Sequence, residues 1–318
     1  SNSYDWHITT WGKTHITVPL PVIVRGENGR WHLFSSSRVA HGQSYEGFYI
    51  AQGGDYDGKI VERNAAGEEV RPIDLSLTKT AFALLFNSAL LMLIVLGAAR
   101  WYKRHPVRTS APGGFVGLME AAVMMIHDDL IKSCVGKDYK RFAPYLLTVF
   151  FFILINNLMG LVPIFPGGAN VTGNIAITLL LAIATFIMTN VFGTREYWKE
   201  IFWPEVPTWL KCPVPMMPAI EFVGILTKPF ALMIRLFANM MAGHAVILSL
   251  TCLVFVTVSM GPVVNGSMTV VSVIFCIFMN LLELLVAFIQ AYVFTMLSAV
   301  FIGLARVEPH HKKEEQEI

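Results

Sequence analysis

Long apolar runs separated by short charged segments dominate this sequence. The first of these runs, 80–100, has about 20 residues, which is enough for one helical crossing of a bilayer. Four more runs follow, and no formal charge occurs between Phe142 and Thr194. The pattern predicts an all-α polytopic membrane protein with five transmembrane helices, at about 80–100, 142–164, 174–194, 219–259 and 267–305.

The last two apolar runs are about twice as long as one crossing requires. Each has roughly 40 residues, or about 60 Å as a helix, against a hydrocarbon thickness of about 30 Å. Either each run splits into two spans, or each is one long, tilted helix. No polar turn interrupts either run, and Gly261-Pro262 and Asn265-Gly266 mark a single break between them. The sequence therefore favours a hairpin of two long, tilted helices.

The segment at about 112–131 has a different pattern. Met119, Val123 and Ile126 recur at helical spacing, but ionisable residues interrupt the apolar positions. These ionisable residues are Glu120, His127, Asp128 and Asp129. The pattern predicts an amphipathic helix that lies along the membrane surface rather than across it.

Residues 1–78 are polar and have the character of β structure. The apolar and β-branched stretches 14–24 and 30–36 flank a Gly-Glu-Asn-Gly loop at 26–29, which suits a hairpin. The stretch has too little apolar material for a large core. We expect a small, β-rich domain outside the membrane.

Clustered basic residues predict the orientation of the spans. Lys and Arg follow the first span, occur at 131–141 and 195–211, and continue into a charged tail at 307–318. The turns at 166–174 and 260–267 carry none. The positive-inside rule then places the tail in the cytoplasm and the N-terminal domain on the periplasmic side, which five crossings satisfy.

Composition agrees with a membrane protein. The 318 residues are 54% hydrophobic and 14% charged with a mean hydropathy of +0.56, whereas a soluble domain is about one quarter charged. This composition excludes a soluble enzyme, and the net charge of +2 gives no indication of a nucleic-acid partner. The four cysteines lack the spacing of metal ligands and none lies in the polar N-terminal region, so neither a disulfide nor a metal site is expected.

Arg235 lies in the middle of the fourth apolar run. A guanidinium group cannot lose its proton at cellular pH, and placing it near the centre of a membrane costs at least about 3 kcal/mol on insertion scales. Such a charge is usually kept because a function needs it. The other candidate polar groups in the last two runs are Glu221, Lys228, Asn239, His244, Glu283 and Gln290.

Two interpretations account for these groups. Titratable groups at different depths can relay protons, and a permanent cation between them blocks a continuous proton path. Alternatively, the charges neutralise one another as buried ion pairs that hold the helices in register. Asn239 and Gln290 fit both interpretations equally well. Asn156, Asn157 and Asn174 are weaker candidates, and interhelical hydrogen bonding is the favoured role of the first two.

Two stretches of the last two apolar runs have distinctive sequences: residues 228–244 read KPFALMIRLFANMMAGH, and residues 281–294 read LLELLVAFIQAYVF. These two motifs resemble the a subunit of rotary F-type ATP synthases. The family pattern is K-P-x-S/A-L-x-x-R-L-F-G-N-M-x-A-G followed by His or Glu, and then Q-A-Y/F-V/I-F in the last helix. The resemblance covers about residues 80–306, and it departs from the pattern at Ala238, where the family usually has glycine.

The resemblance implies a proton-channel stator subunit with two offset half-channels. Arg235 would face the ring of c subunits, attract its carboxylates and stop protons from passing directly between the half-channels. Glu221 would serve the inner half-channel. Some family members exchange the His and Glu positions between the two helices, which supports a pairing of His244 with Glu283. The residues that the family pattern places in the outer half-channel are His244, Glu283, Gln290 and Asn239.

The resemblance also implies the partners of the chain. These are the c-ring, the b subunits of the peripheral stalk, other Fo and F1 subunits, and the lipid bilayer. No cofactor or nucleotide site is expected, because the sequence has no Walker-type loop and ATP would be made on other subunits. The tail rich in Lys and Glu favours a bacterial inner membrane over a mitochondrial one, and the titratable His–Glu pair favours protons as the coupling ion.

Two other classes of protein stay open from the residues alone. A secondary transporter with a midplane site would have inverted repeats and broken helices in matching halves, and we find no repeat. A membrane-anchored receptor with an outer β domain would leave Arg235, His244 and Glu283 without a role.

Overall fold

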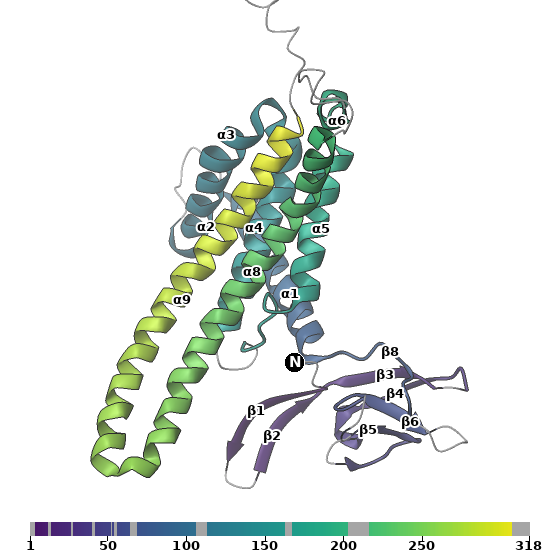
Figure 1. Cartoon of the computed structure of the whole chain (residues 1–318), viewed down its shortest axis with the longest axis vertical. Coiled ribbons are helices and arrows are strands. Elements are labelled where there is room, and N and C mark those ends of the chain that lie inside the picture. Colours follow the sequence, from purple (N-terminus) through teal and green to yellow (C-terminus); the bar gives the residue numbers. More distant parts are fainter. Residues whose placement is uncertain are drawn as a thin grey trace, which may run out of the picture. The chain divides into compact units, whose positions relative to one another are not determined.

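A computed structural model describes most of the chain (Figure 1). It describes residues 4–11, 14–26, 28–39, 42–51, 53, 56–63, 69–105, 113–162, 167–202 and 216–306. The charged tail at 307–318 and the part of the predicted basic loop beyond Phe202 lie outside the described residues. The chain divides into two compact units, residues 1–89 with 162–169 and residues 90–161 with 170–318.

The first unit contains eight short strands in three antiparallel sheets. Strand β1 pairs with β2, the second sheet has the order β4-β3-β8, and the third has the order β5-β6-β7. The strands are β1 Asp5–Trp11, β2 Thr14–Pro19, β3 Pro21–Arg25, β4 Trp31–Ser35, β5 Phe48–Ile50, β6 Ile60–Arg63, β7 Glu69–Val70 and β8 Ile73–Asp74.

The core of this unit follows from the two-residue period of the strands. In β3, Val22 and Val24 are buried while their neighbours are more exposed, as expected for a strand with one face toward a core. They pack with Phe34, Phe48 and Ile60. At the edge of the core the Tyr4 hydroxyl donates a hydrogen bond to Asp74 Oδ2 at 2.5 Å. Burial, together with this bond to a carboxylate, raises the pKa of Tyr4, so the phenol remains a donor at neutral pH.

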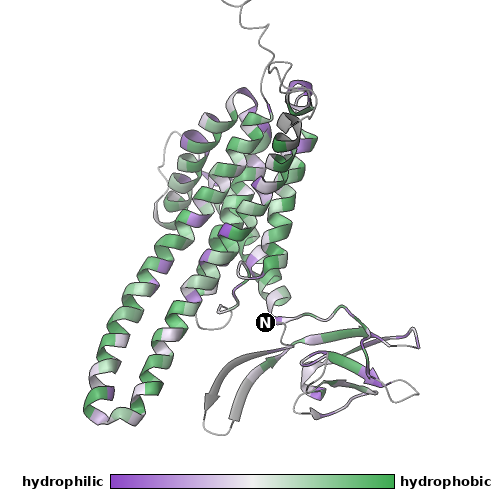
Figure 2. Cartoon of the chain, viewed as in Figure 1, coloured by the Kyte–Doolittle hydropathy of each residue, from purple (hydrophilic) through white to green (hydrophobic). Residues whose placement is uncertain are grey.

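The remainder of the described chain is mostly helical. The helices are α1 Lys79–Arg104, α2 Gly114–Met124, α3 Lys132–Val135, α4 Tyr139–Leu161, α5 Ile175–Val191, α6 Arg195–Phe202, α8 Met216–Thr257 and α9 Pro262–Leu304. A π-helical segment, Met125–Ile131, joins α2 to α3. Figure 2 shows the predominance of hydrophobic residues on these helices.

Four described helical stretches are long and apolar enough to cross a membrane. They are Lys79–Arg104, Gly114–Leu161, Phe222–Met260 and Pro262–Leu304, and Ile175–Val191 is a shorter apolar helix. The protein is therefore a polytopic helical membrane protein, as the apolar runs predict.

The stretch Gly114–Leu161 is not one straight helix. It reverses at the 3-10 turn Gly136–Asp138, where Gly136 has a φ of +76° that favours glycine. After this reversal, α4 packs against the preceding segment, and Ile126, Leu130 and Ile131 enter the same core as α4. Asp128, Asp129 and Lys132 on the other side of that segment are exposed, so it is amphipathic.

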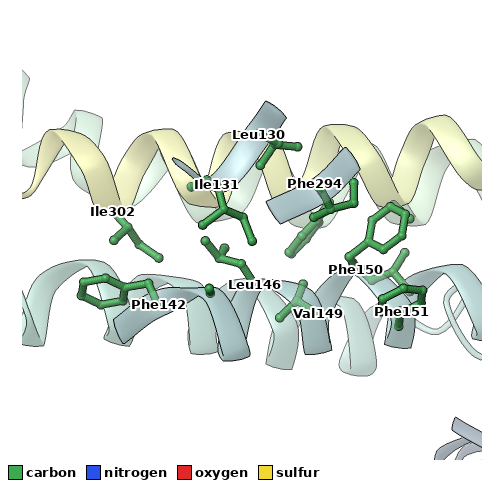
Figure 3. Packing of buried hydrophobic residues seen from close by; sticks show 14 of the residues in the cluster. Leu130, Ile131, Phe142, Leu146, Val149, Phe150, Phe151, Phe294 and Ile302 are labelled. Atoms are coloured by element: carbon green, nitrogen blue, oxygen red, sulfur yellow. The ribbon is translucent and has the colours of Figure 1, made fainter. Parts of the chain in front are cut away.

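The largest core of the second unit lies between the π-helical segment, α4 and α9 (Figure 3). Figure 3 shows Leu130, Ile131 and Leu146 directed toward one another, with Phe294 and Ile302 of α9 beside them. At the end of α9, Gly303 lies so close to α3 that an added Cβ would be 2.1 Å from the Cys134 carbonyl oxygen. The small residue lets the two backbones approach each other.

Helices α8 and α9 form a long antiparallel hairpin, visible in green and yellow in Figure 1. They have 42 and 43 residues, about 60 Å each at 1.5 Å per residue. The 3-10 turn Val258–Met260 and Gly261, with a φ of +104°, make the connection, and Pro262 starts α9. Asn265-Gly266, predicted as part of the break, lies inside the first turns of α9.

Candidate functional site

Helix α8 carries most of the candidate polar residues of the sequence. Lys228, Arg235, Asn239 and His244 all lie within its 42 residues, and Pro229 is accommodated inside it. Glu221 is also in α8, but its side chain is outside what the structure describes. A helix that is apolar nearly all round can place these few polar groups at defined heights, because each residue advances by about 1.5 Å.

The antiparallel course of α9 brings Gln290 opposite Asn239. The Asn239 amide Nδ2 donates a hydrogen bond to Gln290 Oε1 at 2.7 Å. Gln290 is 3% exposed, whereas Asn239 is exposed. The bond therefore links the interior of the hairpin to its surface.

A second polar pair lies about two turns further along the hairpin. His244 Nδ1 is 3.6 Å from Glu283 Oε1, and the two side chains are 34% and 4% exposed. This separation is too long for a direct hydrogen bond but is within the reach of a charge interaction or of a bridging water. Glu283 and Gln290 are seven residues apart in α9, which places them on one helix face, and both are buried.

Gly243 makes room for the Glu283 side chain. An added Cβ at Gly243 would lie 2.6 Å from Glu283 Oε1 and 2.9 Å from its Cδ. Any side chain at this position would have to displace the carboxylate. The glycine that precedes His244 thus sets how closely the carboxyl group approaches α8.

Buried polar atoms without hydrogen bonds concentrate at these two pairs. Within the described residues, His244 Nε2, both Glu283 carboxylate oxygens and Gln290 Nε2 are buried and have no hydrogen-bond partner. Most buried polar groups in proteins are paired, because an unpaired group costs about 1–3 kcal/mol. Three residues together carry four such atoms, so this part of the hairpin is the candidate site.

Arg235 is an exposed residue of α8. It lies four residues before Asn239, one helical turn away, and nine residues before His244. No ion pair of Arg235 occurs among the described residues. An arginine presented on the outside of an apolar helix is available to a partner of opposite charge.

The three asparagines that the sequence gives as weaker candidates have local structural contacts. Asn157 is fully buried, donates to the Ala287 carbonyl of α9 at 3.2 Å and accepts from Thr172 Oγ1 at 2.7 Å. Asn156 donates to the Phe152 carbonyl in its own helix at 2.8 Å. Asn174 caps α5, where its Oδ1 accepts from the Ala176 amide at 3.0 Å. Asn157 thus has the interhelical hydrogen bond that the sequence favours, whereas this bond of Asn156 lies within α4.

The other half of the hairpin borders a small cavity with a mostly apolar lining. Its volume is about 20 Å³, enough for about one water molecule. The cavity lies among α5, α6, α8 and α9, and its polar lining residues are Thr185, Thr189, Asn190, Tyr197 and Lys228. The Lys228 ammonium also lies 5.7 Å from the centroid of the Phe301 ring, within cation–π range.

Hydroxyl groups near this cavity form contacts that sequence reasoning missed. Thr185 Oγ1 lies 3.1 Å from the Tyr145 hydroxyl and 3.3 Å from Ser298 Oγ, which connects α4, α5 and α9. Ser272 of α9, also missed, is buried with an unpaired hydroxyl. Its spacing of 11 residues from Glu283, which places both on one helix face, is a signal that could have identified it.

The described residues do not form a metal centre. Among them, no three His, Cys, Asp or Glu side chains gather closely enough to hold an ion. The chemistry available at the hairpin is therefore that of a permanent cation, a histidine, a carboxylic acid and neutral amides.

Comparisons with known proteins find similarity over most of the chain. The family model described as ATP synthase A chain matches residues 84–303, and one described as a domain of unknown function (DUF8433) matches residues 1–76. Among curated proteins, ATP synthase subunit a of Chloroherpeton thalassium is 44% identical over 254 residues, covering 77% of this chain and 71% of that protein. ATP synthase subunit a of Myxococcus xanthus is 41% identical over 245 residues, covering 75% and 76%.

Proposed function

The chain belongs to the ATP synthase A chain family, and we propose that it works there as a proton-channel stator with two offset half-channels and a central arginine. Membership of the family makes it a component of the membrane sector of an ATP synthase, with a role in proton transport and ATP synthesis. The relatives named above are bacterial, which supports a location in a bacterial inner membrane.

Arg235 is the proposed central charge. It faces the c-ring, attracts a ring carboxylate that has lost its proton, and prevents protons from crossing directly between the half-channels. Its exposure on α8 supports this role, because a partner helix can reach the guanidinium group. The group stays charged at every cellular pH, which a barrier to protons requires.

The outer half-channel is proposed to run along the α8–α9 hairpin through His244, Glu283, Gln290 and Asn239. The single observation that carries this proposal is the concentration of buried, unpaired polar atoms on three of these residues. The His244 imidazole and the Glu283 carboxyl group can exchange protons with water molecules that enter the helix pair, and the Gln290 amide can hydrogen-bond to such water. The 3.6 Å separation of His244 and Glu283 suits a relay between two titratable groups.

The inner half-channel is proposed to involve Glu221 and the cavity beside Lys228. Although the lining of the cavity is mostly apolar, Thr185, Thr189 and Asn190 lie in it and could offer hydrogen-bonding groups to a water molecule, which supports this assignment. Along α8, Lys228 and His244 lie on opposite sides of Arg235, as two offset half-channels require.

A membrane arrangement with five crossings fits this mechanism. Helices α1, α4, α5, α8 and α9 cross, and the amphipathic stretch 114–135 lies at the surface. Residues 1–78 form the periplasmic domain, residues 79–306 the membrane domain, and the tail at 307–318 is cytoplasmic. We propose the c-ring, the b subunits of the peripheral stalk and other Fo and F1 subunits as partners.

Proton flux in vesicles that contain the whole complex tests the function. We expect Arg235→Ala to abolish ATP-driven proton pumping while the subunit still co-purifies with the c-ring. Met241→Ala serves as the control, because Met241 is an exposed apolar residue of the same helix, and it should leave pumping unchanged. Normal pumping by Arg235→Ala would show that the arginine is structural and would overturn the proposed mechanism.

A further inference from the structure

The sheet β4-β3-β8 of the N-terminal unit has one buried and one exposed face. Val22 pairs with Phe34, and Val24 pairs with Asp74; these residues face the core. The alternate residues point to the other side, because successive side chains of a strand lie on opposite faces. Across the strands, Ile23 pairs with Leu33.

The exposed face of this sheet is apolar apart from Arg25, which pairs with both Trp31 and Ile73. Leu33 is 73% exposed, Leu75 62%, Ile73 59% and Trp31 54%. Antiparallel sheets with a solvated face usually carry polar residues there, and a contiguous exposed apolar patch marks an interaction site. We refer to Ile23, Trp31, Leu33, Ile73 and Leu75 as the outer sheet face.

The outer sheet face is joined to α1 without a free linker. After β8, the Leu75 amide donates to the Ile23 carbonyl at 2.9 Å, and the Leu77 amide donates to the Pro21 carbonyl at 3.2 Å. The next residue, Thr78, already caps α1, since its Oγ1 accepts from the Ala81 amide at 3.4 Å. The sheet therefore passes directly into a helix that is long and apolar enough to cross a membrane.

This short connection limits how far the outer sheet face can be from a bilayer. Lys79, the first residue of α1, is four residues after Leu75, and four residues span at most about 14 Å. If α1 crosses the membrane, Leu75 lies close to the interface at which the helix enters. A soluble partner would have to compete with lipid for this position.

The outer sheet face is bordered by residues of the types that bind lipid headgroups. The Arg25 guanidinium carbon lies 5.9 Å from the centroid of the Trp31 ring. Two more arginines are exposed: Arg30, which is next to Trp31, and Arg71, which lies two residues before Ile73. Tryptophan is enriched at membrane interfaces, and arginine beside it can bind lipid phosphates while its stem covers apolar surface.

We propose that the outer sheet face docks on the bilayer. Its apolar side chains lie among the parts of the acyl chains nearest the headgroups, and the neighbouring arginines lie at the lipid phosphates. The docked leaflet is the one at which α1 begins. This contact would fix the N-terminal domain against the membrane, and it is independent of the proton path along α8 and α9.

Spin-label accessibility in the reconstituted complex tests this docking. The native cysteines are first replaced, and a nitroxide is attached at Leu33→Cys, at Leu75→Cys, or at Ser44→Cys as the control. All three positions are exposed, so none of these changes removes a core contact. Oxygen, which partitions into the bilayer, and a water-soluble nickel chelate then report on the surroundings of each label.

Docking predicts that the ratio of oxygen to nickel accessibility at positions 33 and 75 is several-fold higher than at position 44. Equal ratios at the three positions would show a face in water and would overturn the proposal. Protection of positions 33 and 75 from both reagents would also overturn it, because the face would then be covered by protein. Agreement between the ratios at positions 33 and 75 would show that the result does not come from a local disturbance by one label.

Discussion

His244 and Glu283 meet across the α8–α9 hairpin, with Nδ1 of the histidine 3.6 Å from Oε1 of the acid. They come from helices joined by a turn and lie 39 residues apart in the chain. The acid is almost fully buried and the histidine is about one third exposed. The pair is thus asymmetric in the exposure of its side chains, although His244 Nε2 and both Glu283 carboxylate oxygens are buried.

Removing the charge of Glu283 tests the relay role of this pair. We expect Glu283→Gln to slow ATP-driven pumping about two- to tenfold, a barrier increase of up to about 1.4 kcal/mol. The shape of the pH dependence should also change, because the amide cannot titrate. Pumping by vesicles between pH 5.5 and 9 provides the measurement. A variant with the wild-type rate at every pH would contradict a relay through Glu283.

Exchanging the two residues tests whether they act as a pair. Glu283→His alone places two histidines side by side, and we expect it to pump more slowly than Glu283→Gln. The double variant His244→Glu with Glu283→His restores one acid and one imidazole and should recover most of the lost rate. Additive losses in the double variant would show that the two residues act independently.

Apolar run length and charge position predict much of this fold. A run of about 40 residues without a polar turn favours one helix of the length seen for α8 and α9. The turn position is less predictable, because Asn265-Gly266 has turn chemistry but Pro262 is compatible with a helix start and sets the beginning of α9. The pairing of Glu283 with His244 followed from the family resemblance.

Contacts between separate helices could not be predicted in the same way. Thr185 and Ser298, whose hydroxyl groups meet, are 113 residues apart in the chain. Each lies in an apolar run, and nothing in the sequence indicates that it contacts the other. The β3–β8 pairing likewise joins residues about 50 positions apart, and nothing in either strand specifies the other. Such contacts depend on how whole helices and strands pack.

Filling the space at Gly243 provides another test of the site. We expect Gly243→Ala to slow pumping to a degree similar to Glu283→Gln, because the methyl group would lie 2.6 Å from Glu283 Oε1 and displace it. Ala238→Gly is the control, since Ala238 is an exposed residue of the same helix and the change only removes a methyl group. Pumping rates of the two variants in the same vesicles give the comparison. A Gly243→Ala complex with the wild-type rate would show that the position of the carboxylate is unimportant.

Asn157 is expected to matter for stability. Asn157→Leu leaves the fully buried Thr172 hydroxyl without its acceptor and breaks the bond to α9, at a cost of about 1–3 kcal/mol. Asn280→Leu is the matched control, because Asn280 is exposed and its amide bonds only within its own helix. Thermal melting of the purified complex should show a lower midpoint for the first variant only. Equal midpoints would mean that the buried hydrogen bonds contribute little.

The surroundings of two glycines in α9 predict opposite effects of a substitution by alanine. An added Cβ at Gly303 would meet the Cys134 carbonyl at 2.1 Å, and this backbone atom can move only if α3 shifts away from α9. We expect Gly303→Ala to lower the melting temperature and the yield of assembled complex, since overpacking costs about 1–3 kcal/mol. At Gly266 nothing lies within 4 Å of an added Cβ, so Gly266→Ala should be neutral or stabilise the helix by up to about 1 kcal/mol. If both variants melted at the wild-type temperature, the close packing of α3 against α9 would not contribute to stability.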